Sequence, residues 1–221
     1  MTESIIQEGL LLVIDGADKG GKKTQSDLLV AFFRNQGFDA EYISYPNYGS
    51  PGAAMVEAYL RGDFGDPFSI DPYIALGFYA HDRKCHKPVV DQLIASGKIL
   101  VCDRYVPSNE AHQAARLKND IERRLLIRYI DWLEHQHLRL RRAHATMYLR
   151  TDATIRSKRV VQDGADDAYE THEQYQREVG LVFDQLAKDQ NYITIECGSL
   201  SKEEIHAMII SELRSRQIIP S

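Results

Sequence analysis

Short runs of consecutive apolar residues alternate along this chain with longer segments in which apolar residues recur every three or four positions. The runs are typical of strands that are buried on both faces, and the periodic segments are typical of amphipathic helices. Because the two kinds of segment alternate, the sequence predicts an α/β fold with a parallel sheet. The expected strands span residues 10–14, 40–45, 99–102, 145–149 and 192–196.

The helical pattern is strongest in two segments. Residues 71–96 are expected to form a long helix, with Asp71 as its N-cap, Pro72 at the first helical position and a kink or restart at Pro88. Residues 120–140 are expected to form another helix, whose apolar stripe indicates a core or a subunit interface. The remaining helices are expected at residues 24–36, 53–60, 108–118, 152–160, 169–188 and 201–216.

Composition limits the class of protein. The chain has 221 residues, 43% of them hydrophobic, and no linker, so we expect a single domain over residues 1–221. The net charge of −5 argues against a nucleic-acid-binding surface. No signal peptide is evident, and no run approaches the roughly 18 apolar residues of a membrane span. The three cysteines lack CxxC spacing, which favours reduced thiols and a cytoplasmic location.

A segment rich in glycine and lysine joins the first predicted strand to the helix that follows. Gly16, Gly21 and Lys22 have the spacing of a phosphate-binding loop, in which bare backbone N–H groups and a helix N-terminus cradle an anion. Lys22 would reach the β- and γ-phosphates as a point charge. A glycine-rich turn without a ligand is the alternative, but the strand before and the helix after disfavour it. The residues assigned to the nucleotide are Gly16, Ala17, Asp18, Lys19, Gly20, Gly21, Lys22, Lys23 and Thr24.

Asp103 and Arg104 directly follow the third predicted strand. A carboxylate beside a phosphate loop can hold Mg²⁺ or its water shell, and the arginine fork suits a second phosphate group. Ligands of such folds bind at the carboxyl ends of the strands, so these residues, the phosphate loop and the loop at 45–48 should meet. The alternatives are a surface ion pair at 103–104 and, within the long helix, a helix-face ion pair between Asp82 and Arg83.

Several motifs together resemble one family. GADKGGKKTQ, YPNYGSPGA, YAHDRKCH and CDRYVPSNEAHQAARL, with the segment around Lys158 and Arg159, occur in the order typical of thymidylate kinases, which are P-loop nucleoside monophosphate kinases. The resemblance implies a three-layer P-loop NTPase sandwich with a five-stranded parallel sheet and a short lid at about 160–169. It also implies phosphorylation of dTMP to dTDP for dTTP synthesis, ATP as phosphoryl donor, Mg²⁺ and a homodimer.

The resemblance assigns roles to individual residues. Lys22 would contact the ATP phosphates, and Arg159 would pack near the adenine. Asp103 would lie near Mg²⁺, and Arg104 would grip the acceptor phosphate. The acceptor nucleoside would meet Asp18 at its sugar 3′-hydroxyl, Tyr48 in a closing loop, Tyr79 stacked on thymine, Arg83 at the base O4 and Asn109 at the thymine edge.

Some positions depart from the family pattern. Lys23 replaces the usual Ser or Thr, so Mg²⁺ would be held by phosphates, water and Asp103. His112 replaces a frequent tyrosine that disfavours a ribose 2′-hydroxyl, and Asn47 stands where an arginine can occur. The lid has no arginine, so Lys19 is the candidate for the charge on the transferring phosphoryl group.

The resemblance therefore predicts in-line phosphoryl transfer from ATP to dTMP, catalysed by positioning and by the charges of Lys22, Arg104, Lys19 and Mg²⁺. Two alternatives stay open. One is a kinase that acts on another deoxynucleotide or on a deoxynucleoside. The other is a nucleotide-binding regulator with weak or no turnover.

Overall fold

The computed structural model describes residues 9–151 and 172–220, and five strands in these ranges form one sheet. All neighbouring strands are parallel, in the order β2-β3-β1-β4-β5, with β1 at the centre. The parallel α/β sheet expected from the sequence is confirmed. The strands are β1 (Leu10–Asp15), β2 (Ala40–Ser44), β3 (Ile99–Asp103), β4 (Ala145–Arg150) and β5 (Ile193–Glu196).

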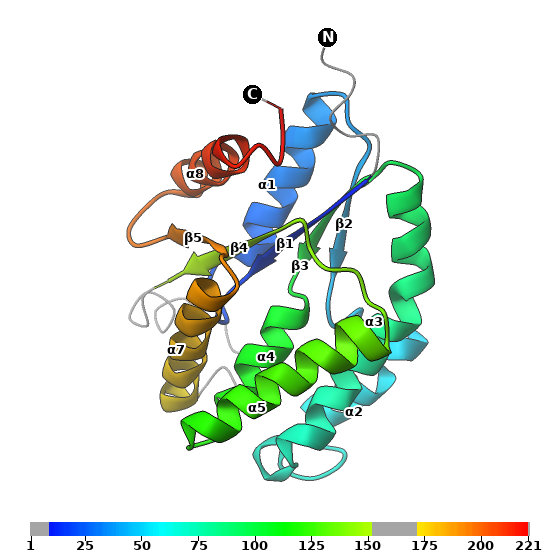
Figure 1. The fold of residues 1–221 in the computed structure, drawn as a ribbon, viewed down its shortest axis with the longest axis vertical. Coiled ribbons are helices and arrows are strands. Elements are labelled where there is room, and N and C mark those ends of the chain that lie inside the picture. Colours follow the sequence, from blue (N-terminus) through cyan, green and yellow to red (C-terminus); the bar gives the residue numbers. More distant parts are fainter. Residues whose placement is uncertain (1–8, 152–171, 221) are drawn as a thin grey trace.

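Helices connect the strands and cover the sheet (Figure 1). The α-helices are α1 (Lys22–Asn35), α2 (Ala54–Arg61), α3 (Pro72–Ala95), α4 (Val106–Ala114), α5 (Asp120–Asp131), α7 (Glu173–Asp189) and α8 (Lys202–Ser215). Two short 3₁₀ segments precede helices: η1 (Pro51–Ala53) precedes α2, and η2 (Pro67–Ser69) precedes α3. A π-helical segment, η3 (Trp132–His137), continues α5.

The helix boundaries correct some of the predictions. The restart expected at Pro88 is wrong, because α3 runs through this residue without a break. The helix expected over 120–140 stops being α-helical at Asp131 and continues as η3. The helix expected from residue 108 begins at Val106, since proline at the second position of a helix, here Pro107, costs no hydrogen bond. The predicted helix at 152–160 and the lid lie outside the described residues.

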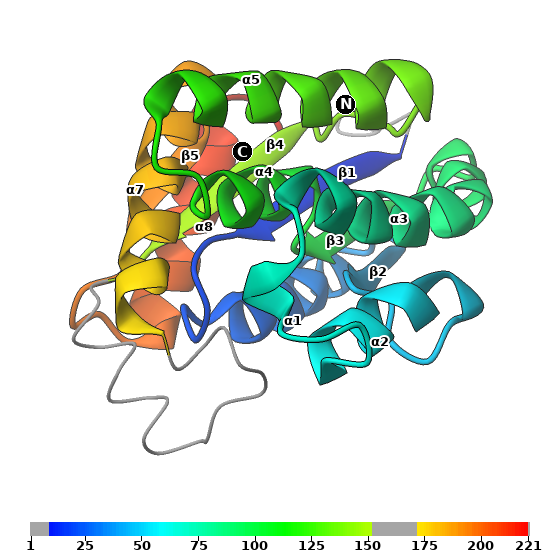
Figure 2. The same ribbon diagram turned by 90° about the horizontal axis from the view of Figure 1, so that it is seen from below.

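Alternate residues of β1 face different helices, which makes three layers. Leu12 and Ile14 pack into a core with α1 and α8. Leu11 and Val13 pack into a second core with α3, α4, α5 and α7. Figure 2 shows α1 and α5 on opposite sides of the sheet. The predicted three-layer sandwich is confirmed, and its central strands are buried on both faces as expected of a parallel sheet.

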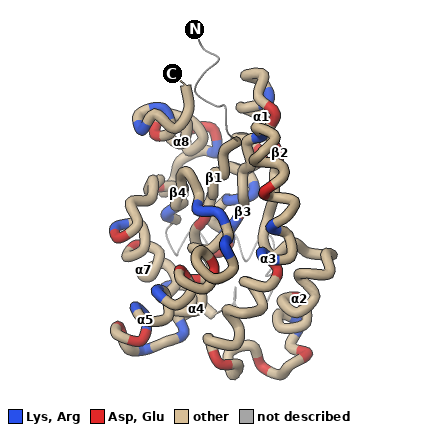
Figure 3. The backbone as a smooth tube through the Cα atoms, turned by 45° about the vertical axis from the view of Figure 1, so that its right-hand side comes forward, with Lys and Arg blue, Asp and Glu red and all other residues tan. Residues whose placement is uncertain are grey.

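Charged residues are spread over the outer helices, and α5 and α7 each carry both signs (Figure 3). Within the described part of the chain, no helix has the length and apolar character needed to cross a membrane. Some charged residues are buried instead. Asp15, Asp18, Lys22 and Asp103 all lie inside, at or just after the carboxyl ends of β1 and β3. This edge of the sheet therefore carries a concentration of buried charge.

Candidate active site

The phosphate loop is the turn between β1 and α1, and its backbone requires glycine. At Gly16 the φ angle is 146°, and a Cβ atom would lie 2.7 Å from the carbonyl oxygen of Leu149. Gly21 is the N-cap of α1 with a φ of 89°. Because α1 begins at Lys22, two residues earlier than predicted, residues 22–24 form its first turn. The N–H groups of this turn have no partners within the helix and suit an anion.

Lys22 is buried under the loop. Its Nζ donates a hydrogen bond to the carbonyl oxygen of Ala17 at 2.8 Å. Burial and the nearby Arg104 lower the pKa of Lys22 to about 8, although the Asp18 and Asp103 carboxylates oppose this shift. An anion bound here would favour the charged form of the lysine.

Asp15, the last residue of β1, was not recognised from the sequence. It is fully buried and accepts hydrogen bonds from the backbone N–H groups of Gly16 (2.9 Å), Tyr105 (3.1 Å) and Ser108 (3.0 Å), and from the Ser108 hydroxyl (2.6 Å). Burial raises its pKa despite the opposing charge of Arg104. Asp15 thus joins the start of the phosphate loop to the start of α4. The sequence feature that could have identified Asp15 is a single carboxylate directly after the apolar run of β1.

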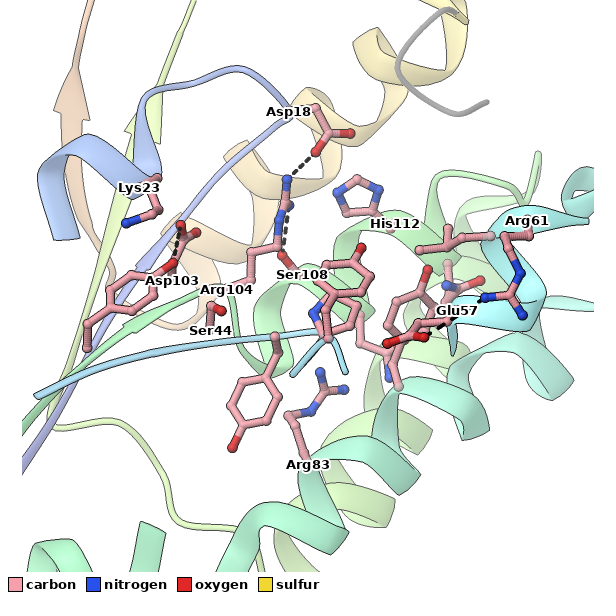
Figure 4. Close-up of a pocket in the computed structure, with 18 of the residues that line it drawn as sticks. Asp18, Lys23, Ser44, Glu57, Arg61, Arg83, Asp103, Arg104, Ser108 and His112 are labelled. Atoms are coloured by element: carbon pink, nitrogen blue, oxygen red, sulfur yellow. Dashed lines mark hydrogen bonds and ion pairs between the residues drawn. The ribbon is translucent and has the colours of Figure 1, made fainter. Parts of the chain in front are cut away.

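Arg104 points back toward the phosphate loop (Figure 4). Its Nη2 forms an ion pair with one carboxylate oxygen of Asp18, and its Nη1 lies 3.3 Å from the Ser108 hydroxyl. The other oxygen of Asp18 accepts a hydrogen bond of 2.6 Å from the side-chain amide of Gln176, in the first turn of α7. Burial opposes ionisation of Asp18, but Arg104 holds its pKa well below the ordinary value. Gln176 is a second residue that sequence reasoning missed.

A pocket of about 930 Å³ opens beside this ion pair. Its walls include every residue that the sequence assigned to the acceptor, namely Asp18, Tyr48, Tyr79, Arg83, Arg104, Asn109 and His112. Lys23 and Asp103 also line it. The structure therefore brings together side chains from the phosphate loop, the loop after β2, α3, the end of β3 and α4. Arg159, the predicted adenine contact, lies outside the described residues.

At the other end of the pocket, Arg83 forms a buried ion pair with Glu134 of η3. Its Nε and Nη2 donate to the two carboxylate oxygens, each at 2.6 Å. The side-chain amide of Asn109 donates to Glu134 Oε1 at 2.8 Å and to the carbonyl oxygen of Leu76 at 3.1 Å. Asn109 Oδ1 is buried and has no hydrogen-bond partner among the described residues. This end of the pocket wall thus combines the cation of Arg83 with the amide of Asn109, whose orientation is fixed by its two donated hydrogen bonds.

The ion pair suggested by the sequence between Asp82 and Arg83 is wrong. Arg83 pairs with Glu134, and Asp82 accepts a hydrogen bond of 2.8 Å from the backbone N–H of Asn47. Asp82 therefore fixes the loop after β2, which carries Tyr48.

The other wall of the pocket carries His112. Its Nδ1 lies 2.9 Å from the Tyr175 hydroxyl, which also donates to the His112 carbonyl oxygen at 3.1 Å. Tyr175 belongs to the first turn of α7, so this helix reaches the pocket wall at Tyr175 and contacts Asp18 through the next residue, Gln176. His112 thus lies where α4 meets α7.

Asp103 is the residue that the sequence predicts near a metal ion. Its Oδ2 accepts from the Tyr42 hydroxyl at 3.3 Å, and the residue lines the pocket. Lys23 has no lone pair for a metal; its Nζ pairs with Asp27 at 2.7 Å and lies 4.5 Å from the Tyr42 ring centroid. Among the described residues, no three His, Cys, Asp or Glu side chains gather to form a metal site. A single carboxylate suits Mg²⁺, which keeps several waters and binds substrate phosphates.

Comparison with known proteins identifies the family. The family model described as thymidylate kinase matches residues 14–209. The chain belongs to the thymidylate kinase family. Thymidylate kinase from Mycobacterium tuberculosis is 29% identical over 185 residues, which cover 80% of this chain and 86% of that protein. A probable thymidylate kinase from Pyrococcus abyssi is 26% identical over 204 residues, which cover 92% and 95%.

The fold agrees with this assignment. The solved structure of thymidylate kinase from Candida albicans matches with a TM-score of 0.76 and 22% identity, over 95% of this chain and 93% of that one. As a member of the thymidylate kinase family, the protein is a nucleoside monophosphate kinase. The predicted family, enzyme class and P-loop NTPase fold are therefore confirmed. The roles of individual residues stay predictions.

Proposed function

We propose that this member of the thymidylate kinase family transfers the γ-phosphoryl group of ATP to the 5′-phosphate of dTMP, with the acceptor lying along the pocket between Arg104 and Arg83. The observation that carries this proposal is the pair of groups at the Arg83 end, a buried guanidinium and the unpartnered Oδ1 of Asn109. Thymine offers the complementary pair, an O4 acceptor and an N3–H donor. Cytosine offers the reverse pair, an amino donor and a bare N3 acceptor, and would set a donor against the Arg83 guanidinium and an acceptor against Asn109 Oδ1.

The phosphate end supports the same orientation. Arg104 would bind the acceptor phosphate, and Asp18, held by Arg104 and Gln176, would accept from the sugar 3′-hydroxyl. Tyr79 lines the pocket and would stack on the base, while Tyr48 would close the loop over the sugar. These roles follow from the family resemblance and from the position of each residue on the pocket wall.

The donor would lie on the phosphate loop. The N–H groups of the loop and of the first turn of α1 would bind the β- and γ-phosphates, and Lys22 would turn from the Ala17 carbonyl to these oxygens. In the reaction, an oxygen of the acceptor phosphate forms a bond to the γ-phosphorus, the bond from this phosphorus to the bridging oxygen breaks, and ADP leaves. The attacking oxygen is already anionic, so positioning and charge neutralisation suffice. Lys19 would add charge to the transferring group.

Mg²⁺ fits the residues present and, when bound, would neutralise charge on the β- and γ-phosphates. Asp103 is the residue proposed to hold it, directly or through water. Lys23, beside Asp103 on the pocket wall, cannot be a ligand and would add a positive charge of its own.

We also propose that the protein is a homodimer. Large apolar side chains of α3, α5 and η3 are 41% to 62% exposed and form one patch, here termed the dimer patch, made of Tyr73, Ile74, Ile121, Leu125, Tyr129 and Trp132. The Tyr73 and Tyr129 rings, 5.8 Å apart, join the two helices within the patch. Contiguous exposed apolar surface of this kind marks an interaction site.

The free thiols of Cys85, Cys102 and Cys197 support a reducing, cytoplasmic location.

A substrate panel tests the proposed function. The enzyme is incubated with ATP and Mg²⁺ and either dTMP, dCMP or thymidine, and ADP and phosphorylated product are measured. We expect dTDP from dTMP, with a kcat/KM at least about a hundredfold above that for dCMP, because cytosine sets a donor against the donor of Arg83 and an acceptor against the acceptor of Asn109. Equal turnover of both monophosphates would contradict the base assignment, and turnover of thymidine alone would indicate a nucleoside kinase. ATP binding without ADP release would indicate a regulator.

A further inference from the structure

Glu134 contacts both of the side chains that face the base end of the pocket. It is fully buried, and its carboxylate binds Arg83 and Asn109 at once. We infer that Glu134 is a positioning residue that sets which groups of the pocket donate and which accept, and so makes the enzyme select pyrimidines with a 4-keto group. This inference rests on the proposed function, because it assumes that a base occupies this end of the pocket.

The contact with Arg83 fixes the guanidinium. Two of its nitrogens, Nε and Nη2, donate to separate oxygens of Glu134, which is the bidentate geometry of arginine with a carboxylate. In a planar guanidinium this arrangement places Nη1 on the edge away from Glu134. Arg83 has only 2% of its side chain exposed yet lines the pocket, as Figure 4 illustrates. Glu134 therefore compensates the buried charge of Arg83 and also fixes the orientation of its guanidinium.

The contact with Asn109 fixes the orientation of an amide. The Nδ2 group donates to two oxygens, Glu134 Oε1 and the carbonyl of Leu76. Reversing the amide would bring Oδ1 against both of these oxygens and break both hydrogen bonds. Asn109 must therefore present Oδ1 on its other side, where no partner is found among the described residues. The carboxylate of Glu134 thus fixes which side of Asn109, a residue of the pocket wall, carries the acceptor.

The backbone places Glu134 where it can do this. Glu134 lies in η3, the π-helical segment that interrupts the helix after Asp131. Hydrogen bonds from Leu138 N–H to the Leu133 carbonyl and from Leu140 N–H to the Glu134 carbonyl, both 2.8 Å, hold this wider turn. Such π-helical turns are frequent at functional sites. The turn points Glu134 into the interior, while Trp132 of the same segment is exposed.

The resulting pattern, a donor from Arg83 beside an acceptor from Asn109, matches O4 and N3–H of thymine. Uracil carries the same two groups, so Glu134 would not distinguish dTMP from dUMP. Cytosine carries the opposite pattern. The selectivity attributed to Glu134 is therefore for 4-keto over 4-amino pyrimidine nucleotides.

The test is Glu134→Gln. A glutamine side chain has a donor as well as an acceptor, so it no longer forces Asn109 to present its oxygen. We expect the ratio of kcat/KM for dTMP to kcat/KM for dCMP to fall by at least about tenfold, mainly through a higher KM for dTMP. The KM for ATP should stay within about twofold, because the hydrogen bonds of the Glu134 carboxylate go to Arg83 and Asn109, which are assigned to the acceptor. A merely structural role would lower activity with both acceptors alike and leave the ratio unchanged.

Glu110→Gln is the matched control. Glu110 is also a buried acid, one residue after Asn109 on α4, but its carboxylate accepts from Gln190 at 3.2 Å and does not line the pocket. Burial raises the pKa of Glu110 to about 8, so glutamine resembles its predominant neutral form at pH 7. We expect this variant to keep the wild-type ratio.

If the Glu134→Gln variant does not fold, Glu134→Asp tests the positioning role of Glu134 instead. Aspartate keeps the buried charge beside Arg83 but is too short to hold Arg83 and Asn109 together, so the ratio should again fall. An unchanged ratio in a folded Glu134→Gln or Glu134→Asp variant would overturn the inference while leaving the proposed function intact. Failure of the wild-type enzyme to prefer dTMP over dCMP would instead contradict the proposed function.

Discussion

The guanidinium of Arg104, at the end of β3, is ion-paired with the carboxylate of Asp18 in the phosphate loop. Arg104 has a φ of 67°, which is uncommon for a residue other than glycine, and its N–H donates to the carbonyl oxygen of Ile14 at 3.1 Å. The backbone at the end of β3 thus turns the arginine toward the loop expected to hold the donor. An acceptor phosphate bound by Arg104 would lie next to that loop, as in-line transfer requires.

Replacing Arg104 by alanine should remove the clamp on the acceptor phosphate. We expect kcat/KM for dTMP to fall by about a hundredfold or more, because the lost group neutralises charge in a buried site. The affinity for ATP, measured by isothermal titration calorimetry without acceptor, should change by less than about threefold. Arg142→Ala is the control, since Arg142 is an exposed arginine that pairs with Asp131 outside this pocket. Wild-type kinetics in Arg104→Ala would exclude Arg104 from the clamp.

A second prediction about catalysis concerns the positive charge of Lys19. It lies in the phosphate loop with a φ of 55°, between Asp18 and Gly20. If it supplies charge to the transferring phosphoryl group, Lys19→Ala should lower kcat by about tenfold or more, while KM for each substrate changes by less than about threefold. Steady-state kinetics with both substrates varied measures this difference. An unaltered kcat would refute the role of Lys19.

Binding of ATP should depend on pH through Lys22. Its pKa is lowered to about 8 by burial and by Arg104, so the lysine is charged below pH 8 and loses its proton above it. Phosphate oxygens favour the charged form, so the affinity for ATP should be nearly constant below about pH 7 and fall as pH rises through 8, by up to about tenfold per pH unit. Calorimetric titration between about pH 6.5 and 9.5 at constant ionic strength measures this slope. Lys22→Arg, whose side chain stays charged, should flatten it, and a flat wild-type profile would contradict the assignment.

The dimer patch provides a prediction on assembly. Leu125 is 53% exposed on α5, so Leu125→Glu would place a charge within an apolar interface and should shift the protein from dimer to monomer. Sedimentation velocity measures the two species. The control is Leu181→Glu, because Leu181 is 55% exposed on α7 and lies outside the patch. A dimer that persists in Leu125→Glu would show that another surface mediates assembly.

The sequence predicted correctly those features of the fold that depend on residues close together along the chain. The strands follow from apolar runs, and the phosphate loop follows from Gly16, Gly21 and Lys22, whose positions along the chain determine the geometry. The position of Arg104 also follows, since the parallel sheet brings the ends of β1 and β3 to one edge.

The residues that sequence reasoning missed act through partners far along the chain. Asp15 binds Ser108, 93 positions away, and Gln176 binds Asp18, 158 positions away. The sequence predicted that Glu134 lies in a continuous helix over residues 120–140. No local sequence pattern indicated the π-helical segment η3, which turns its side chain into the interior. Its partner Arg83 is 51 positions away, so the pairing of these two buried charges became visible only in the folded structure.

In the proposed complex, the acceptor phosphate lies between Lys22 and Arg104, and the acceptor base lies against Arg83 and Asn109. A crystal structure with dTMP and a non-hydrolysable ATP analogue would show both ends of this arrangement at once. We expect Arg104 on the dTMP phosphate, Lys22 on the β- and γ-phosphates, and thymine O4 and N3 within hydrogen-bond distance of Arg83 and Asn109 Oδ1. Thymine bound elsewhere, or a dTMP phosphate without contact to Arg104, would contradict it.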